Sequence, residues 1–223
     1  TGSVAATVLS AIGAKTGGDV TCSGALTITG TTAEITDALV TSNSKVLASS
    51  ANVTFDDDPT AAQLALINTA AGGTITLNDD SQTFSGTAAD LSAAFSGGLA
   101  GTQTGAVTIT DSSGTIAATT LSGIGGQTDG VVTAASAGIT ISGTAAEVTA
   151  ALVTTGSLVV AANADVTITD TGSVAATVLS AIGAKTGGTV TCSGALTITG
   201  TTAEITAALV TPSSLVVAGS AAV

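Results

Sequence analysis

Two segments of this chain, residues 1–40 and residues 171–210, have almost the same sequence. Both read TGSVAATVLSAIGAKTGG, one variable residue, VTCSGALTITGTTAEIT, a second variable residue and then ALV. The copies differ only at Asp19 against Thr189 and at Asp37 against Ala207. So close an internal copy indicates that the chain is part of a tandem array, and this constrains the fold more than any other feature.

The basic repeat is shorter than the spacing of these copies, at about 57 residues. The motif VTITD at residues 166–170 also stands at residues 107–111, and TTAE at residues 201–204 is matched by TAAE at residues 144–147. We therefore divide the chain into four repeats: residues 1–52, which lack the first strand of a repeat, the diverged residues 53–106, residues 107–165 and residues 166–223.

Both ends of the chain fall within a repeat. Residue 1 corresponds to residue 171, just after a VTITD segment, and residue 223 corresponds to Val166, the first residue of that segment. Terminal repeats of a free-standing solenoid usually have distinctive capping sequences, and neither end of this chain has one. We therefore expect either a segment of a longer protein or a subunit that joins end to end.

Each repeat divides into two similar halves of about 28 residues, in which a strand pattern is followed by a helix pattern. Val166–Thr169 and Leu196–Thr199 alternate apolar residues with Thr, which predicts half-buried strands with Val and Ile facing inward. Val174, Val178, Leu179 and Ile182 fit one face of a helix. The glycines after the helix patterns predict helix ends with positive φ, as at Gly183.

Helix starts are marked by a Thr followed three residues later by Glu or Gln, the signature of a capping box. The four instances are Thr31/Glu34, Thr60/Gln63, Thr144/Glu147 and Thr201/Glu204. The helices that follow are too short to be stable alone and require a sheet to pack on. The expected fold is an α/β solenoid of about eight 28-residue strand–helix–strand coils. The alternative is a string of four small β/α domains.

The composition excludes several classes of protein. A net charge of −12, with Lys15, Lys45 and Lys185 as the only basic residues, gives no basic patch for nucleic acid. The chain contains no run of 18 apolar residues, so the sequence predicts no membrane span. An acidic surface rich in Thr, Ser, Ala and Gly is typical of secreted bacterial surface proteins, so we expect an extracellular location. Hydrophobic residues make up 44% of the chain, which is too much for a disordered protein.

Catalysis is hard to place in this sequence. The chain has no His to activate a Ser, and it lacks the common metal-binding and nucleotide-binding motifs. We therefore expect no enzymatic activity. Cys22 and Cys192 occupy the same position of the first and fourth repeats, where the other repeats have Leu77 and Ala134. An inward position and a large separation along the solenoid predict two buried free thiols.

Calcium is the best candidate among ligands, and no other cofactor is expected. Its candidate ligands are carboxylates at turns after strands, namely Asp56, Asp57, Asp58, Asp111 and Asp170. Calcium takes six to eight oxygen ligands, so a single Asp at each turn would need help from carbonyls or neighbouring coils. The alternative interpretation is that these Asp residues cap the helix that follows.

Thr residues alternate with apolar residues along the strand patterns and would face solvent. Pairs such as Thr27/Thr29 and Thr197/Thr199 could stack into a ladder that binds ice, although Thr is also a good strand former on any solvent face. Thr-rich surfaces also bind or carry glycans, which makes surface glycans an alternative partner.

The repeated VTITD or TITG strand followed by a capped AAEITAAL-like helix resembles the tandem-repeat regions of giant secreted cell-surface proteins of bacteria and cyanobacteria, including adhesin-like proteins. The resemblance covers the whole chain and implies an extracellular structural or adhesive role, without naming site residues. The expected function is a structural segment of a surface fibre, sheath or adhesin stalk that stacks end to end with copies of itself. The alternative is a binding module for calcium, ice or glycan.

Overall fold

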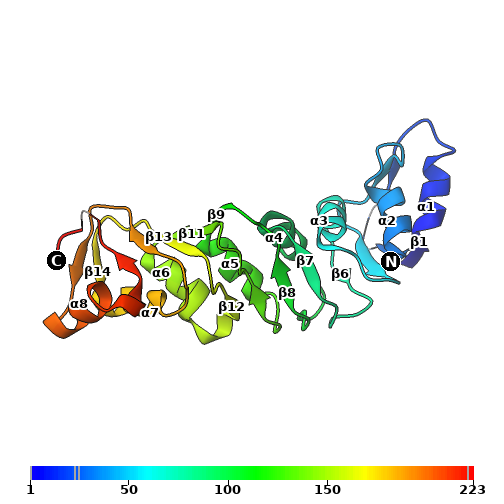
Figure 1. The fold of residues 1–223 in the computed structure, drawn as a ribbon. Helices are drawn as coiled ribbons and strands as arrows, with labels where there is room; N and C mark the ends of the chain where they lie inside the picture. Colours follow the sequence, from blue (N-terminus) through cyan, green and yellow to red (C-terminus); the bar gives the residue numbers. More distant parts are fainter. Residues whose placement is uncertain (1, 23, 25, 220) are drawn as a thin grey trace. The chain divides into compact units, whose positions relative to one another are not determined.

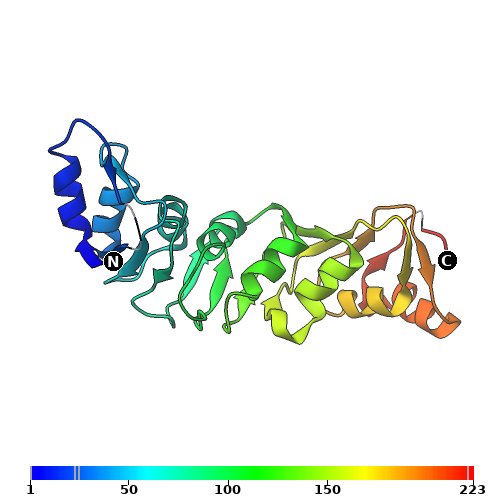
Figure 2. The same ribbon diagram turned by 180° about the vertical axis from the view of Figure 1, so that it is seen from behind.

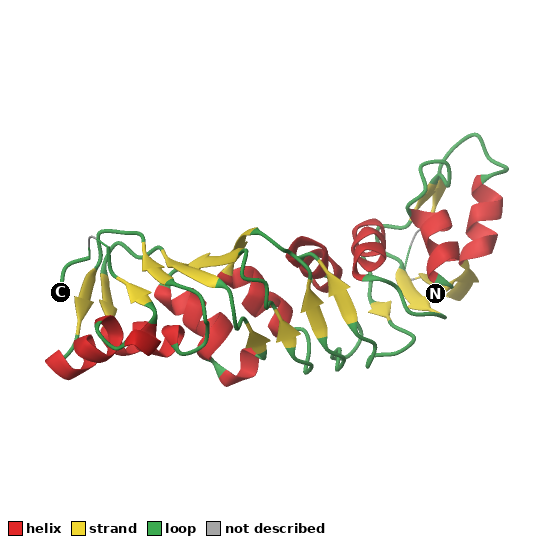
Figure 3. Ribbon diagram, in the orientation of Figure 1, coloured by secondary structure: helices red, strands yellow, loops and turns green. Residues whose placement is uncertain are grey.

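The computed structural model describes residues 2–22, 24, 26–219 and 221–223. The fold is mixed α/β: strands pair in parallel, helices alternate with them, and the described residues form no closed barrel (Figures 1 and 3). The chain divides into two compact units, Thr1–Gly105 (unit 1) and Ala106–Val223 (unit 2). This division lies one residue before the expected boundary between the second and third repeats, while the four repeats themselves stay a prediction.

Unit 1 begins with a strand and alternates strands with short helices. Its helices are α1 (Ala6–Gly13), α2 (Thr32–Leu39), α3 (Ala61–Ala70) and α4 (Ala88–Phe95). Its strands are β1 (Gly2–Ala5), β2 (Val20–Thr21), β3 (Leu26–Gly30), β4 (Val46–Leu47), β5 (Asn52–Phe55), β6 (Ile75–Thr76) and β7 (Phe84–Gly86). The strands β1, β3, β5 and β6 form a parallel sheet in that order, and β2 pairs with β4. Helices α1 and α2 lie side by side in both views (Figures 1 and 2).

Unit 2 has the same alternation. Its helices are α5 (Ala118–Gly125), α6 (Ala145–Val148), which continues as a π-helix (Thr149–Val153), α7 (Ala176–Gly183) and α8 (Thr202–Leu209). Its strands are β8 (Val107–Ile109), β9 (Gly114–Ala117), β10 (Val132–Thr133), β11 (Ile139–Gly143), β12 (Val159–Val160), β13 (Asp165–Ile168), β14 (Ser173–Ala175), β15 (Val190–Cys192), β16 (Thr197–Thr199) and β17 (Val216–Val217). A parallel sheet has the order β17-β15-β13-β11-β9, β10 pairs with β8 and β12, and β14 pairs with β16.

Several local predictions are confirmed. In the predicted strand at residues 166–169 the apolar residues point inward, and Val166 and Ile168 of β13 are fully buried. All four predicted capping boxes are present, at the starts of α2, α3, α6 and α8. In each, the Thr side chain accepts a hydrogen bond from the amide three residues later, and the Glu or Gln side chain accepts one from the Thr amide.

Paired strands are closer in sequence than the half-repeat that the sequence pattern suggested. Gly2 pairs with Leu26, and Thr140 pairs with Asp165. The reason is a strand that the sequence pattern did not reveal. β14 lies between β13 and α7, and its Val174 pairs with Ile198 of β16 instead of lying on the face of a helix.

Counting strands and α-helices alone, the fourth repeat contains seven segments, in the order β13, β14, α7, β15, β16, α8 and β17. The third repeat also contains seven, from β8 to β12, and the 3-10 helices Thr155–Ser157 and Pro212–Ser214 precede β12 and β17. Two equal halves, as the sequence suggested, would give an even number. Because the number is odd, neighbouring strands of one sheet differ in whether they precede or follow a helix in the chain. In unit 2, β9 and β11 directly precede helices, β13 opens a repeat, and β15 and β17 follow helices. In unit 1, β1, β3 and β5 directly precede helices and β6 follows α3, because no strand lies between β5 and α3.

The glycines that end α1, α5 and α7 are required by close backbone contacts, not by positive φ. A Cβ atom on Gly183 would overlap with the carbonyl oxygen of Ser214, and one on Gly125 would overlap with that of Ser157. Positive φ was expected at Gly183 but is absent there, and occurs instead directly after these serines, at Leu158 and Leu215. The glycines thus let the next stretch of chain pack directly onto the helix end.

Candidate functional site

Asp57 binds the N-terminus of a helix that lies earlier in the chain. Its Oδ1 accepts hydrogen bonds from the backbone N–H and from the hydroxyl of Thr32, 25 residues before it, each at 2.6 Å. Thr32 is the first residue of α2, so its amide is one of the donors that a helix leaves unsatisfied at its start. A carboxylate at this place also interacts favourably with the helix dipole.

Asp170 makes the equivalent contact in unit 2. Its Oδ2 accepts a hydrogen bond of 2.6 Å from the backbone N–H of Ala145, the first residue of α6. The capping box of the same helix satisfies the amides on either side: Glu147 accepts from the Thr144 amide at 2.8 Å, and Thr144 accepts from the Glu147 amide at 3.3 Å. The carboxylates of Glu147 and Asp170 and the hydroxyl of Thr144 therefore accept hydrogen bonds from three backbone amides at the start of α6. Of these groups, Asp170 comes from the turn after the neighbouring strand, β13.

The expectation that these Asp residues cap the helix that follows them is wrong. The helix after Asp57 is α3, which is capped by Thr60 and Gln63. The helix after Asp170 is α7, which begins after Ala175 without a side-chain cap. The cause is spacing, because β14 separates Asp170 from α7, whereas parallel pairing brings Asp170 beside the start of α6.

Three of the five candidate calcium ligands, Asp56, Asp57 and Asp58, lie in unit 1, and the other two lie in unit 2. Asp56 is exposed, and its amide donates to the Gly30 carbonyl at 2.9 Å. Asp58 is exposed and accepts a hydrogen bond of 3.4 Å from the Asn78 side chain, while Asp57 caps α2. In unit 2, Asp111 is partly buried after β8 and Asp170 caps α6.

Among the residues that the structure describes, no three His, Cys, Asp or Glu side chains are grouped so that they could hold a metal ion. A calcium ion needs six to eight oxygens, which one carboxylate cannot supply. Calcium binding by Asp56, Asp57, Asp58, Asp111 or Asp170 therefore stays a prediction, and Asp57 and Asp170 each accept a hydrogen bond from the start of a helix.

Glycines at the ends of the strands that precede capping boxes make room for this arrangement, namely Gly143 at the end of β11 and Gly200 after β16. A Cβ atom on Gly143 would lie 3.0 Å from Oε2 of Glu147 and 3.0 Å from Cβ of Ala118. A Cβ atom on Gly200 would lie 3.0 Å from Oε2 of Glu204. Glycine stands where a capping-box Glu needs space, and Asp stands where its carboxylate reaches a neighbouring helix. The position after successive strand patterns alternates between Asp and Gly in the sequence, and this alternation is the signal for the arrangement: Asp57, Asp111 and Asp170 against Gly30, Gly86, Gly143 and Gly200.

The outward rows of the sheets contain Thr without forming a continuous Thr ladder in unit 2. In that unit one row runs through Ala117, Ser142, Thr167, Thr191 and Val217. In unit 1, Thr29, Thr54 and Thr76 are direct neighbours, and Ala5 precedes them. An ice-binding surface requires a longer uniform row, so these rows give that alternative limited support.

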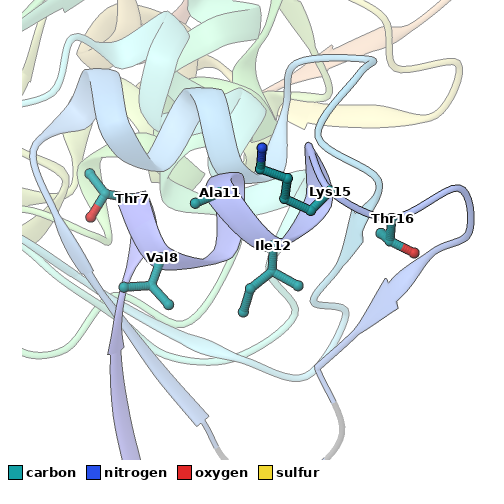
Figure 4. A pocket seen from close by; sticks show the side chains of 6 residues that line it. All are labelled: Thr7, Val8, Ala11, Ile12, Lys15 and Thr16. Atoms are coloured by element: carbon teal, nitrogen blue, oxygen red, sulfur yellow. The ribbon is translucent and has the colours of Figure 1, made fainter.

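Two exposed apolar side chains of unit 1 lie on α1. Val8 and Ile12 project from the same side of this helix and are 48% and 47% exposed (Figure 4). They line an open hollow of about 550 Å³ together with Thr7, Ala11, Lys15 and Thr16. In α7, which has the same sequence, Ile182 is fully buried and Val178 is partly buried.

Cys22 and Cys192 are both buried free thiols, as predicted. Burial raises the pKa of both thiols above the ordinary value for cysteine, and the negative charge of Asp170 raises the pKa of Cys192 further. A raised pKa keeps the thiol protonated at neutral pH, which lowers its reactivity.

Within the part of the chain that the structure describes, every helix is too short or too polar to cross a membrane. Comparisons of the chain with protein-family models, with curated proteins and with solved structures found no match.

Proposed function

We propose that this chain is a structural segment of a long extracellular protein that builds a surface fibre, sheath or adhesin stalk. The observation that carries the proposal is that each part of the fold is completed by the part next to it in the sheet. Asp57 and Asp170 cap helices that begin 25 residues earlier. Parallel strand pairs join the first repeat to the second through β3 and β5, and the third to the fourth through β11 and β13.

These strand pairs favour a solenoid over a string of four small domains, because separate domains would keep their strand pairs within one repeat. Along the sheet of unit 2, the chain passes from each strand to its neighbour through one coil of two strands and one helix.

Three repeats of about 57 residues span about 170 residues, which is the separation of the two near-identical segments. A block of three repeats that was copied as a whole supports a longer array of the same repeats.

The mechanism is mechanical. Each coil buries the apolar side of the next, and the stability of such an array grows with the number of coils. The extracellular location rests on the acidic composition and on the resemblance to giant secreted adhesin-like proteins. Calcium or ice binding is the weaker alternative, since Asp57 and Asp170 are engaged in capping and the Thr row of unit 2 is mixed.

Electron cryo-microscopy of surface material from the source cells tests the proposal. We expect filaments or stalks that react with an antibody against this chain and show an axial spacing of about 4.8 Å, the distance between neighbouring strands. Discrete particles without axial order, labelled by the same antibody, would contradict a structural role and favour the binding module.

A further inference from the structure

We propose that residues 58–61 and residues 79–85 enclose a binding site for a short extended segment of another protein, one that carries a basic residue. The site lies entirely within unit 1, in the diverged repeat of residues 53–106. It goes beyond the structural role proposed above and does not depend on it, because its lining belongs to a single repeat of the chain.

A strand pair that the other three repeats form is missing in this repeat. There, the strand before the first helix pairs in parallel with a strand 24 or 25 residues later: Val4 with Ile28, Ile116 with Ile141 and Val174 with Ile198. Counting back from the helix starts, Pro59 takes the place of Val174, and β7 takes the place of β16. Residues 57–60 form no strand, and among the described residues of unit 1 no strand pairs with β7.

The sequence explains why this pair does not form. Three residues separate Asp57 from the helix start at Ala61, whereas five separate Asp170 from the helix start at Ala176. Proline has no N–H group to donate to a ladder, so Pro59 would interrupt a strand at this place. The shorter connection and Pro59 therefore leave β7 without the strand that pairs with its counterparts.

An open hollow of about 380 Å³ lies at this place. One wall consists of residues 58–61, and the other consists of Asp79 and residues 82–85. The walls meet at one end, since a Cβ atom on Gly86 would lie 3.2 Å from Cβ of Ala61. The volume falls within the range of about 300–1,000 Å³ that is usual for ligand sites.

Packing around the hollow keeps its walls in place. Helices α3 and α4, which follow the two walls in the chain, pack against each other. Phe84 contacts Phe95 edge to face, with the ring centroids 5.2 Å apart. Ile75 and Leu99 form a further parallel bridge between the same parts of unit 1. The hollow is therefore preformed, which lowers the cost of ordering a site when a ligand binds.

Backbone groups at the hollow are available to an extended peptide. Among the described residues, no hydrogen bond joins the backbone of residues 57–60 to that of residues 82–86. Where the strand pair is formed, the amide of Thr197, the equivalent of Thr83, donates to the carbonyl of Gly172 at 2.8 Å. The Thr83 amide has no such acceptor within unit 1. An added peptide strand supplies one, because its main chain pairs with the unpaired edge of a strand.

Charge favours a basic peptide at this edge. Asp58 and Asp79 lie on opposite walls, and no residue that lines the hollow is basic. Oδ1 of Asp79 accepts hydrogen bonds from the amide and the hydroxyl of Ser81 at 2.8 and 2.7 Å, which lowers the pKa of the Asp79 carboxyl and keeps it ionised. A Lys or Arg side chain would form charge-assisted hydrogen bonds with these carboxylates. A second copy is an unsuitable source of this residue, because the chain has three basic residues and a net charge of −12.

An NMR titration of the isotope-labelled chain with the peptide acetyl-KGSVA-amide tests the site. GSVA is the sequence that occupies the equivalent place at residues 2–5 and residues 172–175, and the added Lys stands at the end that this register places toward Asp58. Acetyl-EGSVA-amide is the matched control peptide. We expect KGSVA to shift the amide signals of Thr83 and Ser85 saturably, and EGSVA to bind at least about fivefold more weakly. The signals of Thr140 and Ser142, the equivalent residues of the paired strand β11, should not shift.

Variants of the chain test the two parts of the argument separately. Asp58→Asn and Asp79→Asn should each weaken binding about two- to fivefold, and added salt should weaken it by screening. Asp37→Asn is the control, because it removes the same charge from an exposed residue outside the hollow. Replacing residues 58–60 with the five residues TGSVA of 171–175 should restore the strand pair and abolish binding. Circular dichroism and the remaining amide signals verify that each variant keeps the native fold.

The site is overturned if KGSVA causes no saturable shift at Thr83 and Ser85, if EGSVA binds as tightly, or if Thr140 and Ser142 shift equally. Shifts at Thr83 and Ser85 that appear with rising protein concentration alone would assign the hollow to a second copy and overturn the choice of partner. None of these outcomes bears on the surface-fibre proposal, whose failure would be seen in the microscopy of native surface material.

Discussion

Residues 2–22 and residues 172–192 have nearly the same sequence in two different surroundings. Local structure is the same in both: α1 and α7 have equal lengths, and the residues before them have φ and ψ of −68° and 138° at Ala5 and −70° and 137° at Ala175. Burial is not the same, since Ile12 is 47% exposed and Ile182 is 0% exposed. The local sequence therefore determines that a helix forms, and the neighbouring segment determines whether the apolar face of that helix is buried.

This difference shows where the stability of the fold resides. A short helix with one apolar face gains little by itself, and most of its free energy comes from the segments packed on both sides. Contacts between neighbouring coils should therefore contribute more to the free energy of unfolding than contacts within a coil, as in other repeat proteins.

The largest expected effect comes from truncating the two equivalent isoleucines. Ile182→Ala should lower the free energy of unfolding by about 2–5 kcal/mol, because it leaves a cavity in a packed core. Ile12→Ala should lower it by less than about 1 kcal/mol, because Ile12 is half exposed. Urea titrations of dilute protein, followed by hydrogen exchange in each unit, measure both. Equal losses would show that α1 and α7 do not differ in packing.

The second expected effect compares two glycines within α5. Gly125→Ala should destabilise unit 2 by about 1–3 kcal/mol, because the new methyl group meets the Ser157 carbonyl of the following segment. Gly123→Ala should stabilise it by about 0.5–1 kcal/mol, since a Cβ there meets nothing within 4 Å and Ala favours the helix. The copies already have Ala at this place, at Ala11 and Ala181. Thermal unfolding distinguishes the two, and a loss of stability in both would refute the close contact.

The third expected effect concerns the carboxylate that links neighbouring segments. Asp170→Ala should lower the free energy of unfolding by about 1–2 kcal/mol, because the Ala145 amide loses its acceptor. Hydrogen exchange of the Ala145 amide should accelerate with it. Asp37→Ala is the control, because the equivalent residue of the second copy is Ala207. A calcium titration monitored by the same exchange would show whether Asp170 also binds the ion.

The features that the sequence revealed correctly are those encoded within a few residues. The capping box of Thr144 and Glu147 needs only four positions, and the inward Val166 and Ile168 need only a period of two. β14 could not be recognised in this way. This short strand, Ser173–Ala175, is held by pairing with β16, which follows only after α7 and β15, and such a distant partner leaves no local signal.

The role of Asp170 was misassigned for the same physical reason. An Asp just before a helix pattern predicts a cap for that helix, and only the parallel pairing of β11 with β13 brings it to α6 instead. The alternation of Asp and Gly after successive strands did contain the missing information. Gly143 stands where Ala118 and Glu147 leave no space for a side chain, whereas Asp170 extends its side chain to another helix.

The smallest expected effect uses the two thiols at equivalent positions of the copies. Cys22 is 9% exposed and Cys192 is 3% exposed, and Asp170 raises the pKa of Cys192 in addition to burial. A higher pKa leaves less thiolate at a given pH, so Cys192 should react with a disulfide reagent several-fold more slowly than Cys22 at about pH 8. Peptide mapping of the labelled chain measures the two rates, and both should become equal in denaturant.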